Sequence, residues 1–330
     1  MFDCITFGGA TRDIFFKTAK GVIFPDPEDA EEKMLAFKYG QKIITDNAYF
    51  SFGGGAFNAA VSMAKSGLKV AAHINVGRDE SAYSIVQQLK FLGIDTSLVM
   101  TDPENHTAMS ILVIDKKDHV AFLHRGANNY LKTPPADKLK NTKWFFITSL
   151  TGESAKMLPD LIDFASTNNI KVALNPGSAQ LKGDCRQLKA LIEKIELLIL
   201  NREEAETLIC SNEACEIIED NNVLLSKAQK LGAKRVIITE GAKGSYYTDS
   251  ELVNFEPAFK ENGVAVDTTG AGDAFGSTFM ANIIQGASTP LAQKRAAVNA
   301  ASVTEYIGAQ EGLLTPKAIE AKLKKIKVIR

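Results

Sequence analysis

Short apolar runs alternate with segments of helical hydrophobic spacing along most of the chain. Runs of β-branched and aliphatic residues predict strands, and apolar positions three and four residues apart predict helices. The predicted strands cover residues 4–7, 69–76, 144–148, 171–174, 196–200 and 235–239. The predicted helices cover residues 81–92, 153–166, 269–285, 290–304 and 315–325. This alternation is typical of a mainly parallel sheet with helices on both faces.

Two regions depart from the alternation and carry period-two patterns instead. They are residues 14–52 and residues 109–124, the second of which reads as a hairpin that turns at residues 116–118. Sheet segments of this kind near ligand loops commonly form a lid or a dimer contact. We expect these two segments to form a β lid that also mediates a homodimer. The expected α/β core is residues 1–13, 53–108 and 125–330.

Composition limits the classes of function that the chain can serve. It has 330 residues, 45% of them hydrophobic, and 38 basic residues against 39 acidic ones. A large core is therefore expected, and a broad electrostatic contact with nucleic acid or an anionic membrane is not. No apolar run approaches the roughly 18 residues that span a bilayer, so we expect a soluble cytoplasmic protein acting on a small molecule. Four cysteines are too few for a disulfide scaffold, and we expect them to be reduced.

A glycine turn precedes the first of the C-terminal helices, in the string Asp267-Thr-Thr-Gly-Ala-Gly-Asp273. Gly270 and Gly272 allow close backbone approach, and the helix that follows directs unpaired N–H groups at the turn. This predicts an anion site. A carboxylate at Asp273 can accept the proton of a hydroxyl that is being phosphorylated, although Asp is also common in a first helical turn. No Walker-type phosphate loop occurs in the sequence. The dinucleotide glycine motif is also absent, which argues against a Rossmann dehydrogenase.

A second glycine run, Gly53-Gly54-Gly55, opens another predicted helix that contains Asn58. The Asn58 amide offers a donor and an acceptor, which suits sugar hydroxyls, whereas a flexible loop with Asn58 at the helix start is the plain alternative. Asp13 follows the first strand and a glycine-containing loop. Because open α/β sheets bind ligands beyond the carboxyl ends of their strands, Asp13 is expected to accept hydroxyl hydrogen bonds.

Together these strings resemble the ribokinase-like (pfkB) carbohydrate kinase family over nearly the whole chain. The first family signature is similar to Gly54-Gly55-Ala56-Phe57-Asn58, and the second is similar to residues 267–280. Weaker similarities lie at residues 201–204, 239–244 and 308–310. The resemblance implies a three-layer α/β/α sandwich with a mainly parallel central sheet and a small β-sheet lid.

The same resemblance implies an ATP-dependent kinase that transfers the γ-phosphate to a hydroxyl of a sugar. Asp273 would be the general base, and the anion hole would be the amides of Gly270, Ala271, Gly272 and Asp273. The sugar would be bound by Asp13, Gly54, Gly55 and Asn58. The nucleotide would be bound by Asn201, Thr239, Gly241 and Gly244. Glu204 would hold Mg²⁺ through water, and a monovalent cation, K⁺, would be held at Asp267, Thr269 and Gly308.

Departures from the family pattern leave the acceptor open. Gly55 stands where ribokinase carries a lysine, and Glu153 matches a sugar-contacting glutamate of ribokinase only with a two-residue insertion. A nucleoside kinase would need an apolar pocket for the base, which would be lined by Phe15, Phe16, Phe50 and Phe52. A sugar-phosphate kinase would need added cationic groups. A non-catalytic sugar or nucleotide sensor would have no need for the base at Asp273.

Overall fold

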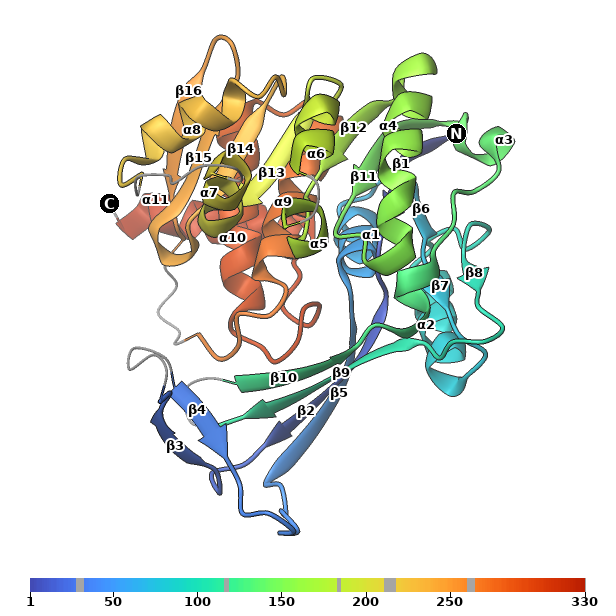
Figure 1. The fold of residues 1–330 in the computed structure, drawn as a ribbon. Helices are drawn as coiled ribbons and strands as arrows, with labels where there is room; N and C mark the ends of the chain where they lie inside the picture. Colours follow the sequence, from blue (N-terminus) through green and yellow to red (C-terminus); the bar gives the residue numbers. More distant parts are fainter. Residues whose placement is uncertain (28–32, 116–118, 183–184, 211–217, 260–264, 330) are drawn as a thin grey trace.

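The computed structural model of the chain describes residues 1–27, 33–115, 119–182, 185–210, 218–259 and 265–329. Within these residues, the largest sheet has eight strands in the order β16-β15-β14-β13-β12-β11-β1-β6 (Figure 1). All neighbours from β6 to β14 are parallel, and β15 and β16 add an antiparallel edge. The strands are β1 (Phe2–Phe7), β6 (Val70–His73), β11 (Thr142–Ile147), β12 (Lys171–Leu174), β13 (Leu197–Asn201), β14 (Val236–Thr239), β15 (Gly244–Thr248) and β16 (Val253–Pro257).

Side chains of this sheet alternate between two hydrophobic cores. Along β11, Trp144 and Phe146 belong to one core, while Phe145 and Ile147 belong to the other. The first core is completed by the helices α1 (Gly55–Lys65), α2 (Glu80–Phe91), α9 (Ala271–Ile284) and α10 (Thr289–Val303). The second is completed by α4 (Leu158–Thr167), α5 (Ser178–Leu181), α6 (Cys185–Ile192), α7 (Arg202–Cys210) and α8 (Asn221–Gln229). Strands buried on both faces explain why the predicted strands read as continuous apolar runs.

The remaining elements of the body are short, apart from the C-terminal helix α11 (Pro316–Ile329), which packs on α10. The short elements are α3 (Ala136–Leu139), the 3-10 helices η1 (Gly126–Tyr130), η2 (Gly152–Met157) and η3 (Gly241–Lys243), and the strand pair β7 (Asn75–Val76) and β8 (Met100–Thr101). No helix in the described ranges is both long and apolar enough to cross a bilayer.

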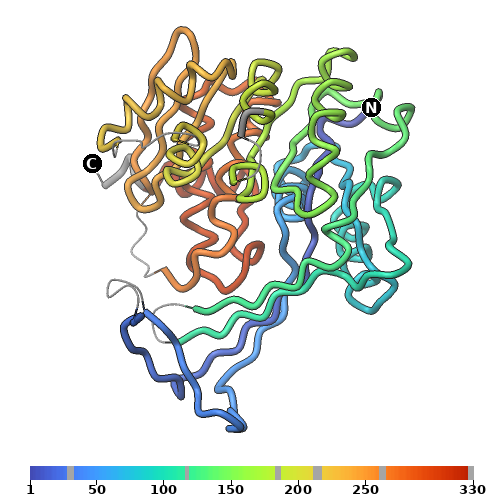
Figure 2. Tube along the Cα trace, viewed as in Figure 1, coloured from blue at the N-terminus to red at the C-terminus, as the bar shows by residue number. Residues whose placement is uncertain are grey.

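A separate four-stranded sheet extends from the body, in the order β10-β9-β2-β5. Its strands are β2 (Thr11–Lys17), β5 (Asn47–Gly53), β9 (Ala108–Ile114) and β10 (His119–His124). Figure 2 shows these strands running side by side away from the body, with the hairpin of β3 (Val22–Pro25) and β4 (Lys33–Ala36) at the far end (Figure 1). We call this four-stranded sheet the lid. The expected hairpin at residues 109–124 is confirmed by β9 and β10, and its turn at 116–118 lies outside the described residues.

The fold class expected from the sequence is confirmed, with four differences in detail. The edge hairpin of β15 and β16 and the helix α8 were not predicted. Helix α4 begins at Leu158 rather than at residue 153, because η2 precedes it. The lid already begins at Thr11, so Asp13 lies within a lid strand. Cys4 is a free buried thiol, whereas Cys210 is disulfide-bonded, so the expectation of four reduced cysteines is wrong at Cys210. A disulfide depends on the approach of two Cα atoms, which a sequence does not show.

Candidate active site

The two glycine motifs are joined by a direct side-chain hydrogen bond. Asn58 Nδ2, on α1, donates to Asp273 Oδ2, on α9, at 2.8 Å. Gln310 Nε2 in turn donates to Asn58 Oδ1 and to the backbone carbonyl of Phe52, both at 3.1 Å. A backbone carbonyl can only accept, so it fixes the orientation of the Gln310 amide and, through it, that of the Asn58 amide. Asn58 therefore presents its NH₂ group to the Asp273 carboxylate.

The Asp273 carboxylate has one oxygen held and one oxygen free. Among the described residues no donor reaches Oδ1, while Oδ2 accepts from Asn58. Burial raises the pKa of Asp273, and the hydrogen bond from Asn58 lowers it. A carboxylate of raised pKa is a stronger base, and its unoccupied oxygen is where an incoming hydroxyl can place its proton.

The turn before α9 has the geometry of an anion site. Gly270 caps the helix in the left-handed conformation, at φ 76°, and a Cβ there would lie 2.2 Å from the Cβ of Ala309. The amide of Ala271 donates to the carbonyl of Thr268 at 3.2 Å, so it is used within the turn and, contrary to the expectation from the sequence, is not directed at an anion. In the described part of the chain the amides of Gly272 and Asp273 have no backbone acceptor, and a Cβ at Gly272 would meet open space. These amides can bind an anion at the positive end of the helix dipole.

Asp267 ties this turn to the loop that contains Gly308. Its Oδ1 accepts from the amide and hydroxyl of Thr269, at 2.9 and 2.7 Å, and its Oδ2 accepts from the amide of Gly308 at 2.9 Å. Both carboxylate oxygens are thus engaged in holding backbone in place. The arrangement brings Asp267, Thr269 and Gly308 together.

Asp13 reaches the site from the lid. The hydroxyl of Ser110, on β9, donates to Asp13 Oδ1, and a Cβ at Gly53 would lie 2.0 Å from Asp13 Oδ2. Burial raises the pKa of Asp13 to about 6 and the Ser110 hydrogen bond opposes this, while the charges of Asp267 and Asp273 add to the rise. These electrostatic effects show that the three carboxylates share one region. The backbone at Gly54 also approaches closely, because a Cβ there would lie 2.5 Å from the carbonyl oxygen of Gly9.

Asn201 and Thr239 lie at the carboxyl ends of two adjacent strands of the central sheet. They are register partners, as the last residues of β13 and β14. Asn201 Oδ1 accepts from the Glu204 amide and Glu204 Oε2 accepts from the Asn201 amide, both at 2.8 Å, which forms a reciprocal helix cap. Burial raises the pKa of Glu204, with Glu203 and Asp273 adding to the rise. Glu204 is therefore within electrostatic range of Asp273.

The turn after β14 contains the other two residues expected to bind the nucleotide, Gly241 and Gly244. Gly241 has φ 49°, and a Cβ there would meet nothing within 4 Å, which leaves its backbone accessible. Gly244 has φ 124°, and a Cβ there would lie 2.2 Å from the Glu256 carbonyl oxygen, so only glycine fits. The predicted nucleotide residues thus lie at the ends of neighbouring strands.

Comparison with known proteins shows the family of this chain. The sequence profile of the pfkB family carbohydrate kinases matches residues 26–316. The chain belongs to the pfkB family of carbohydrate kinases. It is therefore a phosphotransferase that acts on an alcohol group.

Individual relatives of this kinase are distant and cover most of its length. It is 27% identical over 285 residues to the ribokinase of Haemophilus influenzae, covering 84% of this chain and 89% of that one. The Burkholderia thailandensis nucleoside kinase in complex with inosine has a TM-score of 0.79 at 18% identity, covering 98% of both chains. The Arabidopsis thaliana ribokinase complexed with ribose and ATP has a TM-score of 0.78 at 20% identity, covering 98% of this chain and 99% of that one. The two structures show that the fold is shared.

The lid of this kinase corrects one expectation from the sequence. Phe15 shares the face of Asp13, but Phe16, Phe50 and Phe52 do not, since successive side chains of a strand alternate and Phe52 is the register partner of Arg12. The Arg12 guanidinium lies over the rings of Phe50 and Phe52, at 5.5 and 4.8 Å from their centroids. The four rings therefore do not line one pocket, and Arg12 is turned away from the acceptor side.

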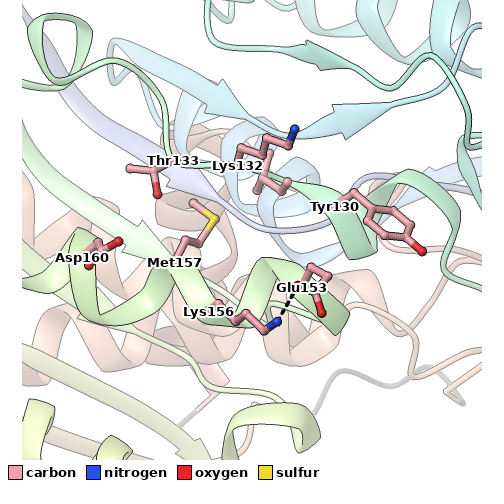
Figure 3. A pocket seen from close by; sticks show the side chains of 8 residues that line it. Tyr130, Lys132, Thr133, Glu153, Lys156, Met157 and Asp160 are labelled. Atoms are coloured by element: carbon pink, nitrogen blue, oxygen red, sulfur yellow. Dashed lines mark hydrogen bonds and ion pairs between the residues drawn. The ribbon is translucent and has the colours of Figure 1, made fainter.

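A pocket of about 390 Å³ lies apart from these residues, between η1, η2 and the start of α4 (Figure 3). Glu153 lines it and forms an ion pair with Lys156 at 2.6 Å, drawn as the dashed line. The side chain of Glu153 is 61% exposed. Glu153 thus lies in this separate pocket, among Tyr130, Lys132, Thr133, Met157 and Asp160.

Proposed function

We propose that this protein is an ATP-dependent kinase that transfers the γ-phosphate to a hydroxyl of a sugar, with Asp273 as general base. The observation that carries the proposal is the Gln310–Asn58–Asp273 chain of hydrogen bonds, because it holds a base of raised pKa at the N-terminus of α9. The similarity of this chain to the Haemophilus influenzae ribokinase and to the Arabidopsis thaliana ribokinase complexed with ribose and ATP supports this choice of substrates.

In the proposed reaction the acceptor hydroxyl transfers its proton to the free Oδ1 of Asp273. The acceptor oxygen forms a bond to the γ-phosphorus while the bond to the β-phosphate oxygen breaks, and ADP leaves. The amides of Gly272 and Asp273, with Gly270 shaping the turn, stabilise the charge on the transferring group. Asp13, Gly54, Gly55 and Asn58 orient the sugar, and Asn201, Thr239, Gly241 and Gly244 hold the nucleotide.

The residues present fit the two cations that the family implies. In the described residues no group of three His, Cys, Asp or Glu side chains could enclose a metal ion. Mg²⁺ usually keeps several waters and is held by one or two carboxylates together with substrate phosphates, which suits Glu204 beside the nucleotide. Asp267 uses both oxygens to hold Thr269 and Gly308, so K⁺ would be held by backbone oxygens of that loop. Bound cations would supply charge neutralisation at the phosphates.

A sugar fits the lid better than a nucleoside or a sugar phosphate. On the Asp13 face, the central strands leave little apolar surface for a base, because Phe15 is completely buried and Leu112 is 5% exposed. The exposed apolar side chains of that face, Tyr49 (39%) and Leu123 (55%), lie on the edge strands β5 and β10. Arg12, the cation adjacent to Asp13, stacks on the opposite face, where it cannot meet a substrate phosphate. We therefore place a nucleoside second and a sugar phosphate third.

The test measures ADP formation with a panel of D-ribose, 2-deoxy-D-ribose, D-fructose, fructose 6-phosphate, adenosine and inosine. We expect one free sugar to give the highest kcat/KM. Asp273→Asn should lower kcat by about 10²- to 10⁴-fold with ATP binding retained. Asp163→Asn, at an exposed ion pair with Lys194, is the matched control and should leave kcat unchanged. No acceptor-dependent turnover would refute the kinase proposal, and normal turnover of Asp273→Asn would remove Asp273 from the mechanism.

We also propose a homodimer formed through the outer face of the lid. On that face, Phe50, Ile14, Ile111 and Phe122 form an apolar row across all four strands. Phe50 is 60% exposed and Phe122 is 62% exposed in the single chain, a combination that marks an interaction surface. Light scattering at micromolar concentration should give twice the chain mass, and Phe122→Lys should give a monomer. Phe91→Lys, on the exposed face of α2, is the control, and a monomeric wild type would refute the dimer.

A further inference from the structure

Three polar side chains lie in one row across the inner face of the lid. Ser51 on β5 and Ser110 on β9 are the register partners of Asp13 on β2. Residues directly opposite one another on neighbouring strands point to the same face of a sheet. Asp13 is thus flanked by a hydroxyl on each side, which the two glycine motifs of the sequence did not reveal.

The two serines differ in what they contact. The Ser110 hydroxyl donates to Asp13 Oδ1, and in the described part of the chain it is the only hydrogen-bond donor to that carboxylate. The Ser51 Oγ atom is buried and has no hydrogen-bond partner within the described residues. A buried hydroxyl without a partner is costly, so a group that satisfies it when substrate binds is favoured.

The position of Ser51 shows where that group would come from. A Cβ at Gly308 would lie 3.0 Å from Ser51 Oγ, so the hydroxyl faces the loop that Asp267 holds against the α9 turn. It therefore lies between Asp13 and the loop bound to the anion turn. A sugar offers neighbouring hydroxyls that can bond a carboxylate and a hydroxyl at the same time.

We propose that Ser51 binds a hydroxyl of the acceptor directly and that Ser110 is a positioning residue that orients Asp13 toward the acceptor. The inference rests on the proposed function and deepens it, because it extends the acceptor site to two further lid strands. An ordered carboxylate and a free hydroxyl on rigid strands form a rim that selects polyhydroxylated acceptors over apolar ones.

The charges around Asp13 make the role of Ser110 measurable. Burial raises the pKa of Asp13, the Ser110 hydrogen bond and Arg12 lower it, and Asp267 and Asp273 raise it. Without the hydroxyl of Ser110, the pKa of Asp13 must rise further, so the carboxylate is protonated at a higher pH. Because a protonated carboxyl accepts hydroxyl hydrogen bonds poorly, acceptor binding should then be lost over a higher pH range.

The experiment compares Ser51→Ala, Ser110→Ala and Ser110→Thr with wild type, using the panel acceptor that has the highest kcat/KM. We expect each alanine variant to raise the acceptor KM about tenfold with the KM for ATP unchanged, since each removes one hydrogen bond of the acceptor site. Ser110→Ala should also move the acidic limb of the kcat/KM profile to higher pH, and Ser110→Thr should restore it. Ser84→Ala, on α2, is the matched control and should match wild type.

Deoxy analogues separate a direct contact from a structural effect. With D-ribose and its 1-deoxy, 2-deoxy and 3-deoxy analogues, the penalty of Ser51→Ala should persist for acceptors that keep the contacted hydroxyl and vanish for the one that lacks it. An equal penalty on every acceptor, or none, would overturn the Ser51 contact. An unshifted pH profile for Ser110→Ala would overturn the positioning role. An active wild type with unaffected serine variants refutes this inference alone, whereas a wild type without acceptor-dependent turnover refutes the proposed function and this inference with it.

Discussion

Gln310 offers a sensitive test of how the proposed base is held. Its Nε2 atom donates to the Phe52 carbonyl and to Asn58 Oδ1, and Asn58 then donates to Asp273. Gln310→Glu keeps the size of the side chain but replaces the donor with a carboxylate. The Phe52 carbonyl and Asn58 Oδ1, which both accept, would then face a carboxylate that cannot donate. The Asn58 amide is therefore expected to rotate and withdraw its NH₂ group from Asp273.

The size of the effect follows from the bonds that are lost. A hydrogen bond to a charged group contributes about 1.5–3 kcal/mol, and about 1.4 kcal/mol corresponds to a tenfold change in rate. Loss of the 2.8 Å bond from Asn58 to Asp273 removes this stabilisation from the ionised carboxylate and leaves it unoriented. The smaller ionised fraction and the lost orientation should lower kcat by about 10- to 100-fold near neutral pH. The Asn58 bond lowers the pKa of Asp273 against burial, so its loss raises that pKa. The acidic limb of the kcat profile should move to higher pH, and the defect should be larger in acid than in base.

Steady-state kinetics from pH 5 to 9, with thermal unfolding to verify folding, would measure the effect. The matched control is Gln285→Glu, because Gln285 Nε2 also donates to a backbone carbonyl, that of Ser66, at 2.8 Å, but lies at the other end of α9. Its kcat should stay at the wild-type value. A folded Gln310→Glu enzyme with wild-type kcat would refute the reasoning, and an equal loss in Gln285→Glu would assign the effect to general destabilisation.

Three further predictions concern the acceptor side and the anion turn. Gly53→Ala should raise the acceptor KM at least tenfold in steady-state assays with little change in the KM for ATP, because its Cβ would lie 2.0 Å from Asp13 Oδ2. The acceptor KM of the wild type should rise as pH falls through about 6, the pKa of Asp13, because the ionised carboxylate that accepts hydroxyl hydrogen bonds exists above that pH. An acceptor KM that does not change between pH 5 and 8 would contradict this prediction. Gly270→Ala should lower the free energy of unfolding by at least 1–2 kcal/mol, measured by urea denaturation, and reduce kcat, because φ is 76° and the new Cβ would lie 2.2 Å from that of Ala309.

The sequence carried enough information to predict the strands of the core and the two glycine motifs of the proposed site. Strand β12 has the predicted bounds because its apolar run is short and fully buried. The glycine strings predicted that Asn58 and Asp273, separated by 215 residues, serve one site, and the 2.8 Å bond joins them. The edge strands β15 and β16 escaped prediction because each is only five residues long: β15 shows no alternation, and the alternation of β16 is too short to stand out.

The lid residues could be predicted only in part, because register decides which strands meet. The parity of β2 alone places Phe15 with Asp13 and Phe16 on the other face, a signal that was present in the sequence. No such signal assigns Ser51 or Ser110 to Asp13, since pairing between strands some 40 or 100 residues apart depends on three-dimensional packing.

The carboxylate proposed to bind the acceptor and the proposed base belong to different parts of the chain. Asp13 lies on a lid strand, while Asp273 and the amides of its turn belong to a helix buried between other helices of the body. Acceptor choice and phosphate chemistry can therefore change independently during evolution. Mutations confined to the lid strand positions around Asp13 would retune selectivity in an enzyme whose phosphate-transfer machinery stays intact, which makes this row the place to begin directed evolution toward new acceptors.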